Sequence, residues 1–358
     1  MTAMPNSPGP GTRRETLASL AERGVSTRSG VFAGWRAFTV TLLAGWLLLG
    51  LAAFIYARIK SIPGWAAFPT AAAFLIEFPF YLLPGFEAPR SWFERQGRVR
   101  AACLLAVSAV APWLLYSLAT GEGRLSAFLV LLMVAVAVTF WYIALPAAPV
   151  PDALFLVVIA AVYISKIFDR IYLSPIPKLS ISVLGHLMLI RTAALAILIF
   201  RRNVKADFRF LPNRSEWLAG FRYAGLMLPP VAFAYWALGL VKLRSHPNGM
   251  VLTALLAIGT FFGILWVVAL SEEFFFRGLL QQWLERWTGN PNWALLVATL
   301  IFGSAHLGFH RTFPNWRWAI VAAILGLFCG LAWRKSRSVQ ASMVAHALVV
   351  TVWQVFLQ

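Results

Sequence analysis

Charged residues are scarce in this chain. They make up 12% of its 358 residues, whereas a soluble globular protein carries about 25%. Hydrophobic residues reach 60%, and they lie in uninterrupted runs close to the length that crosses the hydrocarbon of a bilayer. This combination excludes a soluble domain. It predicts an all-α, polytopic bundle of about 10–11 membrane-spanning segments, because helices satisfy their own backbone hydrogen bonds in lipid.

Cysteine is almost absent. The two cysteines, Cys103 and Cys329, both lie inside apolar runs. Two cysteines exclude a disulfide framework and supply too few thiolates for a cysteine-based metal site. The first 35 residues also lack the short apolar stretch and cleavage site of a signal peptide. We therefore expect the two cysteines to be small packed residues.

Acidic residues are few as well, 13 against 31 lysines and arginines, which gives a net charge of +18. The basic residues are spread among short connections and form no basic domain, so nucleic-acid binding is not predicted. With the N-terminus in the cytoplasm, the predicted inside connections hold about twice as many lysines and arginines as the outside ones. Together with an alanine-, arginine- and leucine-rich composition, this favours a multi-pass protein of a bacterial cytoplasmic membrane.

The sequence divides into three parts. Residues 1–35, rich in proline, glycine, serine and arginine, are predicted to be a disordered basic cytoplasmic tail. Residues 36–205 form an N-terminal transmembrane module with no motif, and residues 206–358 form a C-terminal module. The predicted apolar segments are Phe38–Ile59, Ala66–Leu83, Val99–Ala119, Leu125–Leu145, Ala153–Phe168, Leu179–Phe200, Tyr223–Val241, Val251–Leu270, Trp293–Leu307, Trp318–Trp333 and Val339–Leu357.

Ionisable residues at membrane depth concentrate in the last quarter of the chain. Glu272, Glu273 and Arg277 follow an uncharged segment, and His306 and His346 each lie in a later apolar segment. Such groups cost about 2.5–3.5 kcal/mol each to insert and usually have a function. Glu273 and Arg277 are four residues apart on one helix face and can pair. The other glutamate is then free to accept a proton as a general base.

The residues resemble the motifs of the CAAX protease and bacteriocin-processing family of intramembrane proteases, also called the CPBP or Abi family. The family pattern Glu-Glu-x-x-x-Arg is complete at Glu272, Glu273 and Arg277, and Phe-x-x-x-His is complete at Phe302 and His306. The resemblance covers roughly residues 223–358. It makes residues 206–358 a CPBP-like intramembrane protease domain.

The third family motif, His-x-x-x-Asn/Asp, is only half present. It begins at His346, but Val350 stands where asparagine or aspartate is expected. Valine has no side-chain donor, so this part of the family's site is missing or is supplied by another residue. Ser342 and Thr351 are the nearest polar candidates.

The resemblance implies hydrolysis of a peptide bond in a membrane-embedded or lipid-anchored protein or peptide at the bilayer. It assigns activation of water to Glu272, with help from His306. Glu273 and Arg277 would orient the site or contact substrate, and His346 would stabilise the oxyanion, as preorganised donors do in acyl transfer.

A glutamate-type, metal-independent reaction is favoured over a metal-dependent one. The His-Glu-x-x-His helix of common zinc peptidases is absent. The metal-dependent alternative places a divalent ion such as zinc on Glu272, His306 and His346, because three protein ligands and an open position suit a catalytic zinc.

Two other functions stay open at the level of sequence. Buried Glu, Arg and His could serve a membrane transporter as relay groups, and the chain could be a non-catalytic family member that acts in assembly or immunity.

Elsewhere, His186 and Arg191 are expected to face a polar interior or to pair with Asp169 or Glu77. The segment that contains Glu77 and Pro79 is expected to be kinked or re-entrant. His310 is predicted to be interfacial, and His246 carries no signal.

Overall fold

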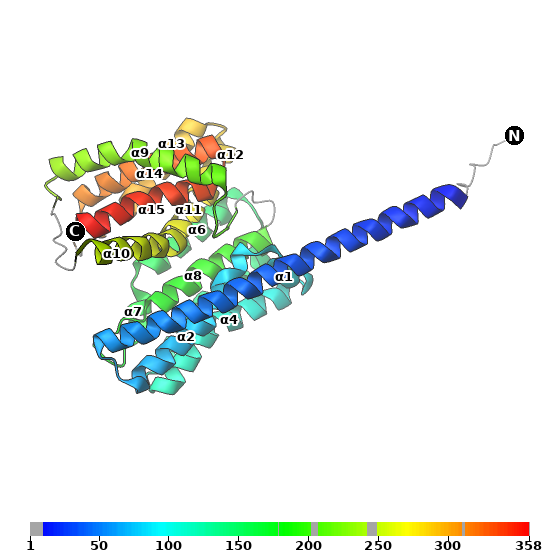
Figure 1. The fold of residues 1–358 in the computed structure, drawn as a ribbon, viewed down its shortest axis with the longest axis horizontal. Helices are drawn as coiled ribbons and strands as arrows, with labels where there is room; N and C mark the ends of the chain where they lie inside the picture. Colours follow the sequence, from blue (N-terminus) through cyan, green and yellow to red (C-terminus); the bar gives the residue numbers. More distant parts are fainter. Residues whose placement is uncertain (1–9, 178, 202–206, 242–248, 310–311, 358) are drawn as a thin grey trace.

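The structure is a computed structural model that describes residues 10–177, 179–201, 207–241, 249–309 and 312–357. Over these residues the chain forms helices joined by short connections, and it contains no strand (Figure 1). In the first half the elements are α1 (Pro10–Lys60), α2 (Gly64–Leu82), η1 (Leu83–Gly85), α3 (Glu87–Arg95), α4 (Arg98–Thr120), α5 (Leu125–Ala144), α6 (Pro149–Ile164), α7 (Ile167–Ile171), α8 (Val183–Leu195) and η2 (Ala196–Arg201).

The second half holds the residues of interest. Its elements are α9 (Arg214–Ala237), α10 (Gly249–Gly263), η3 (Ile264–Ala269), α11 (Leu270–Glu273), η4 (Phe274–Gln281), α12 (Gln282–Thr288), α13 (Pro291–Ala305), α14 (Trp316–Ser336) and α15 (Val339–Phe356). Figure 1 shows α9, α13, α14 and α15 gathered on one side of the molecule, with α1, α2, α4 and α8 on the other.

Eight helices of the described residues are long and apolar enough to cross a membrane. Two shorter apolar helices, α6 and α13, and the 24-residue α9 account for the remaining predicted segments. The polytopic all-α bundle predicted from composition is therefore confirmed. Large apolar side chains stay on its surface: Leu47 is 75% exposed, Phe68 78% and Val251 77%. Such a surface is expected where lipid tails replace water as the solvent.

Helix α1 is helical from Pro10, where the sequence favoured a disordered tail over residues 1–35. The stretch 15–23 is rich in Leu, Ala, Glu and Arg, which are strong helix formers, and it continues without a break into the apolar part. Figure 1 shows this first part extending beyond the bundle. Residues 1–9 lie outside the described residues.

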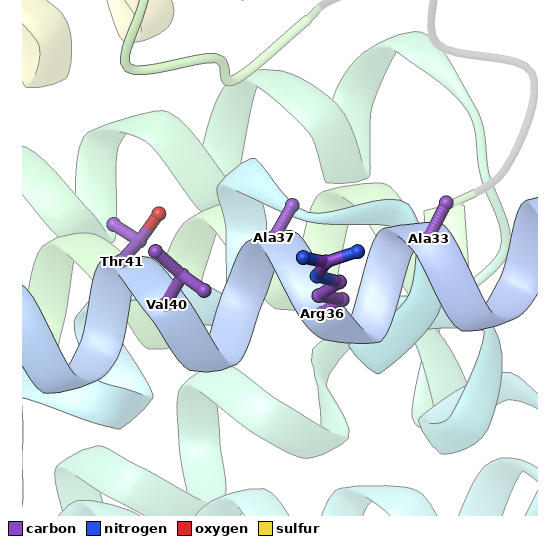
Figure 2. Close-up of a pocket in the computed structure, with 5 residues that line it drawn as sticks. All are labelled: Ala33, Arg36, Ala37, Val40 and Thr41. Atoms are coloured by element: carbon purple, nitrogen blue, oxygen red, sulfur yellow. The ribbon is translucent and has the colours of Figure 1, made fainter.

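The apolar part of α1 is attached to the bundle along one side only, since 6% of its most apolar window is buried. Its outer face carries a shallow hollow, and all the side chains around it come from this one helix (Figure 2). They are Ala33, Arg36, Ala37, Val40 and Thr41. The hollow contains none of the candidate functional residues.

Helix α2 is a single continuous helix in spite of Pro69 and Pro79, so the segment is not re-entrant. Its Glu77 is fully buried and forms an ion pair with Arg191 of α8 (Nη2–Oε2 3.1 Å). Arg191 also donates to Ser108 of α4, at 3.0 Å to Oγ and 2.7 Å to the carbonyl oxygen. Of the two partners predicted for Arg191, Glu77 is the observed one. The ion pair joins α2, α4 and α8 inside the N-terminal half.

A second buried acid lies near the end of this half. Asp152 of α6 pairs with Arg201 of η2 (Nε–Oδ1 2.8 Å, Nη2–Oδ2 2.9 Å) and accepts a hydrogen bond from the Tyr142 hydroxyl at 2.9 Å. Each buried carboxylate thus has an arginine as its partner, and Asp152 also has the Tyr142 hydroxyl as a donor, which offsets part of the cost of removing the charges from water.

Candidate active site

Glu272 and Glu273 lie on a helix whose hydrogen-bond pattern changes twice. The chain is helical without interruption from Gly249 to Thr288, here called the glutamate helix. Two π-helical turns, η3 and η4, flank the four-residue α11 that ends in the two glutamates. π-turns insert one extra residue into a helix and are frequent at functional sites. The local geometry therefore singles out the same residues as the sequence motif.

Glu273 and Arg277 form the ion pair that their spacing predicts. Glu273 is fully buried and Arg277 is 1% exposed. The guanidinium contacts both carboxylate oxygens, with Nε–Oε2 at 3.1 Å and Nη1–Oε1 at 3.2 Å. Arg277 Nη2 also donates to the Gly326 carbonyl of α14 at 2.8 Å, and its guanidinium lies 4.6 Å from the centre of the Phe302 ring. Arg277 thus fixes Glu273 and joins three helices.

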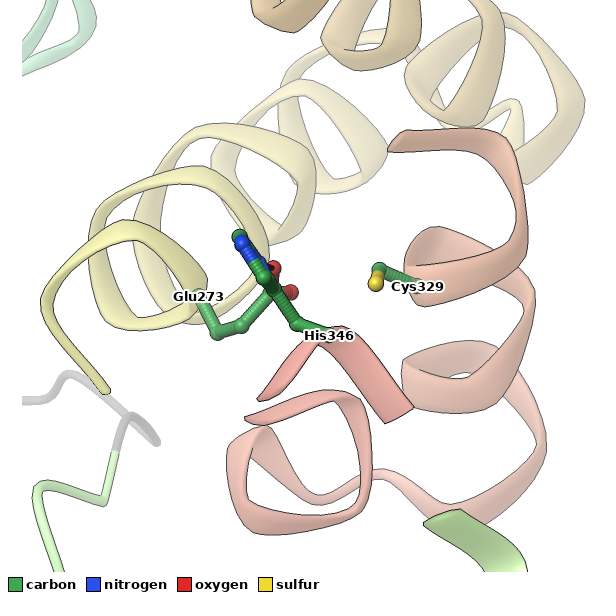
Figure 3. Close-up of side chains that lie close together, drawn as sticks. All are labelled: Glu273, Cys329 and His346. Atoms are coloured by element: carbon green, nitrogen blue, oxygen red, sulfur yellow. Dashed lines mark hydrogen bonds and ion pairs between the residues drawn. The ribbon is translucent and has the colours of Figure 1, made fainter. Parts of the chain in front are cut away.

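His346 of α15 completes this cluster. Its Nδ1 lies 2.7 Å from Glu273 Oε1, and Figure 3 shows the imidazole directed at the carboxylate. An ionised carboxylate only accepts hydrogen bonds, so Nδ1 carries the proton and donates it. A carboxylate in this position fixes the orientation of the ring. Nε2 is left for a different partner.

Glu272 differs from its neighbour. Its side chain is half-buried, and within the described chain its buried Oε2 has no hydrogen-bond partner. Nor does a hydrogen bond join Glu272 to either histidine in these residues.

His306 follows the last residue of α13. Its Nδ1 lies 2.9 Å from the Phe302 carbonyl oxygen, an acceptor, so this nitrogen is the donor and Nε2 presents a lone pair. The Phe302 ring lies 5.0 Å from the His306 ring and 6.1 Å from the His346 ring. The family's Phe-x-x-x-His motif therefore places one aromatic ring between the two imidazoles and against Arg277.

The ligand set of the metal-dependent alternative, Glu272, His306 and His346, is not the group of ligand side chains that the described residues bring together. Among the described residues, the group of three or more ligand side chains that come within 4.8 Å of one another is Glu273, Cys329 and His346 (Figure 3). This set fits a metal poorly, because Arg277 already contacts both oxygens of the Glu273 carboxylate and would repel a cation there.

Val350 stands where the family motif has asparagine or aspartate. Val350 is half-buried and packs in the apolar core. Ser342 Oγ donates to the Cys329 carbonyl at 2.8 Å, so it joins α15 to α14. Thr351 Oγ1 is buried and has no hydrogen-bond partner in the described residues. His310 and His246 lie outside the described residues.

The fold and this cluster define a multi-pass helical membrane protein with a buried Glu–Arg–His network on two converging helices. Residues 254–352 match the family model described as type II CAAX prenyl endopeptidase Rce1-like. The matched range holds Glu272, Glu273, Arg277, His306 and His346, so the resemblance stated from the motifs is confirmed. The match begins after α9 and covers none of the N-terminal helices. No curated protein and no solved structure matches the chain.

Proposed function

We propose that the chain is an intramembrane endopeptidase and that residues 206–358 form its protease domain. The observation that carries the proposal is the contrast between two adjacent glutamates. Glu273 is paired with Arg277 and His346, although its Oε2 meets Arg277 only as an ion pair, whereas Glu272 has a buried Oε2 without a hydrogen-bond partner and no ion pair among the described residues. A partly desolvated carboxylate with a free acceptor is suited to take a proton from water. The family match supports the same class of activity.

In the proposed reaction, Glu272 removes a proton from water while the Nε2 lone pair of His306 helps to hold that water. The oxygen attacks the peptide carbonyl carbon, and the carbonyl oxygen becomes an oxyanion. His346, whose ring is oriented by the bond from Nδ1–H to Glu273, gives the oxyanion a hydrogen bond from Nε2–H in the doubly protonated form of the ring. The carbon–nitrogen bond then breaks, and the proton on Glu272 passes to the departing amine. Arg277 keeps Glu273 in place.

The substrate is proposed to be a membrane-embedded or lipid-anchored protein or peptide. The bundle is surrounded by apolar surface, so a substrate that partitions into lipid meets the site from the bilayer. The description of the matched family names a CAAX prenyl endopeptidase. A peptide with a prenylated C-terminal cysteine is therefore one candidate class.

The proposed location is a bacterial cytoplasmic membrane, with the N-terminus and the connection between η2 and α9 in the cytoplasm. The distribution of lysine and arginine supports this orientation. It places the Glu272 end of its apolar segment near the cytoplasmic face.

We propose that the reaction needs no metal, because Arg277 occupies the carboxylate of the nearest ligand group. The purified enzyme should keep its activity after treatment with a strong chelator. Loss of activity that added zinc restores would establish the metal-dependent alternative.

The experiment that tests the function compares membrane proteomes of cells that express the wild type, Glu272→Gln, His306→Ala or Glu285→Gln. Glu285 is a matched control on the glutamate helix, because it pairs with Arg337 away from the site. One precursor should accumulate with Glu272→Gln and His306→Ala and be processed with the wild type and Glu285→Gln. Equal processing in all four strains would contradict the proposal.

A further inference from the structure

The N-terminal helices, to which no motif gives a role, contact the glutamate helix at its first π-turn. The hydroxyl of Tyr81 on α2 donates to the Trp266 carbonyl of η3 at 2.9 Å, and Tyr81 is 5% exposed. The acceptor is available because of the π-turn. The Leu270 N–H bonds to the Leu265 carbonyl, five residues back, and not to Trp266 as it would in an α-helix. A side chain from another part of the chain uses the carbonyl instead.

Trp266 is held from a second direction by the connection that precedes α9. Its indole Nε1 donates to the Phe210 carbonyl at 3.0 Å. The Phe210 ring lies 5.9 Å from the Tyr81 ring and packs over Gly85, where a Cβ atom would lie 2.4 Å from the ring. The carbonyl and the indole N–H of Trp266 are therefore both bonded outside the glutamate helix.

The second π-turn is contacted from the same connection. Phe208 is fully buried, and its ring meets the Phe274 ring edge-on at 5.1 Å. Phe274 is the first residue of η4 and directly follows Glu273. Tyr81 of the N-terminal half therefore contacts the first π-turn, and the connection, which belongs to residues 206–358, contacts the turns on both sides of the two glutamates.

The part of α2 that carries Tyr81 is restrained by a buried ion pair. It lies one turn after Glu77 on α2, and Glu77 is fixed by Arg191 and, through it, by Ser108. A buried ion pair with these added hydrogen bonds restrains three helices at the point from which Tyr81 projects.

We propose that the N-terminal module acts as a positioning scaffold for the active site, with Tyr81 as the positioning residue. The Tyr81 hydroxyl donates to the Trp266 carbonyl of η3 and so sets the rotation of α11 about the helix axis. This rotation decides where the Glu272 carboxylate points. The kinetic part of this inference rests on the proposed protease function. A displacement of about 1 Å at a reacting group can cost about a hundredfold in rate, so a distant hydroxyl can matter for catalysis without touching the substrate.

The test compares Tyr81→Phe with Tyr116→Phe. The Tyr116 hydroxyl donates to the Leu173 carbonyl at 2.8 Å and belongs to the same N-terminal half, but it does not contact the glutamate helix. Each variant loses one buried hydroxyl-to-carbonyl bond, so a general loss of stability affects both. Hydrogen exchange in detergent micelles should be faster for peptides that cover residues 264–281 in Tyr81→Phe and unchanged there in Tyr116→Phe. With the precursor from the proteome comparison as substrate, kcat should fall about tenfold for Tyr81→Phe, with KM changed less than twofold.

The outcomes separate this inference from the proposed function. Equal exchange over residues 264–281 in the two variants would overturn the scaffold, whatever the activity. Equal kcat in the two variants, with wild-type cleavage that Glu272→Gln abolishes, would overturn the scaffold and leave the protease intact. If the wild type has no Glu272-dependent cleavage, the proposed function fails, and the exchange experiment alone decides whether Tyr81 restrains the turn.

Discussion

At the scale of single residues, two neighbouring glutamates have different surroundings and should respond differently to the same change. Glu272→Gln removes a proton acceptor whose Oε2 makes no hydrogen bond in the described residues, so it should abolish cleavage with little effect on unfolding. Glu273→Gln leaves Arg277 buried without its counter-charge and weakens the bond to His346. Loss of one partner of a buried pair costs about 3–5 kcal/mol. Thermal unfolding in detergent, measured beside cleavage, checks both. Equal destabilisation by the two changes would contradict these separate roles.

Only part of this site could be predicted from the sequence, because some of its contacts join residues within one helical turn and others join residues far apart along the chain. The Glu273–Arg277 pair follows from helical spacing within one turn and is observed. The bond from His346 to Glu273 spans 73 residues and depends on how α15 meets α11, which no local pattern encodes. The Tyr81 contact to Trp266 spans 185 residues and depends on a π-turn that hydrophobic periodicity does not reveal.

At the scale of elements, close packing of α9 on α15 should depend on Gly220. A Cβ atom there would lie 2.5 Å from Val344 and 3.1 Å from the Ala341 carbonyl. Gly220→Ala should therefore push the helices apart and cost about 1–3 kcal/mol, as overpacking does. Gly225 on the same helix has nothing within 4 Å of its Cβ position, so Gly225→Ala should be neutral or slightly stabilising. Thermal unfolding of both variants tests this, and an equal loss of stability would show that the close approach is unimportant.

The first turn of α9 should make the bundle sensitive to acid. Burial alone would raise the pKa of Glu216, but hydrogen bonds from Ser338 (2.6 Å), the Asn213 N–H (2.7 Å) and Arg209 (2.7 Å) outweigh burial and lower it. A lowered folded-state pKa stabilises the fold above the ordinary glutamate pKa of about 4.3 and loses that contribution as the pH falls below it.

The substitution Glu216→Gln tests this pH dependence of stability. Its unfolding temperature should lie below that of the wild type at pH 7, and the gap should narrow as the pH falls from about 5 towards 3.5. A gap that stays constant over this range would mean that the Glu216 carboxylate has no preferential stabilisation in the folded state.

At the scale of the whole molecule, composition alone predicted the class of fold. Each of the apolar segments found in the sequence corresponds to a helix, because a run of this length in lipid has no other way to satisfy its backbone. The continuation of α1 to Pro10 was missed because its proline, glycine and serine content resembles a tail, while its helix formers join it to the apolar part. The glutamate helix was predicted to end at Leu270, since charge follows, but it continues to Thr288.

The proposed orientation makes a prediction for the two ends of α4. Gly97 and Gly121 flank this helix, adopt positive φ (79° and 74°), and have nothing within 4 Å of a Cβ position. A phosphatase that is active only outside the cytoplasm should be active when fused after Gly121 and inactive after Gly97. A fluorescent reporter that matures only in the cytoplasm should give the opposite pattern. Reversed results would invert the orientation.

The measurement that tests the central claim most directly is cleavage by purified protein in liposomes, with the accumulated precursor as substrate. The wild type and Glu285→Gln should cleave it at similar rates, and Glu272→Gln should be slower by at least about a hundredfold, in keeping with loss of a general base. Cleavage by Glu272→Gln at the wild-type rate would contradict the account.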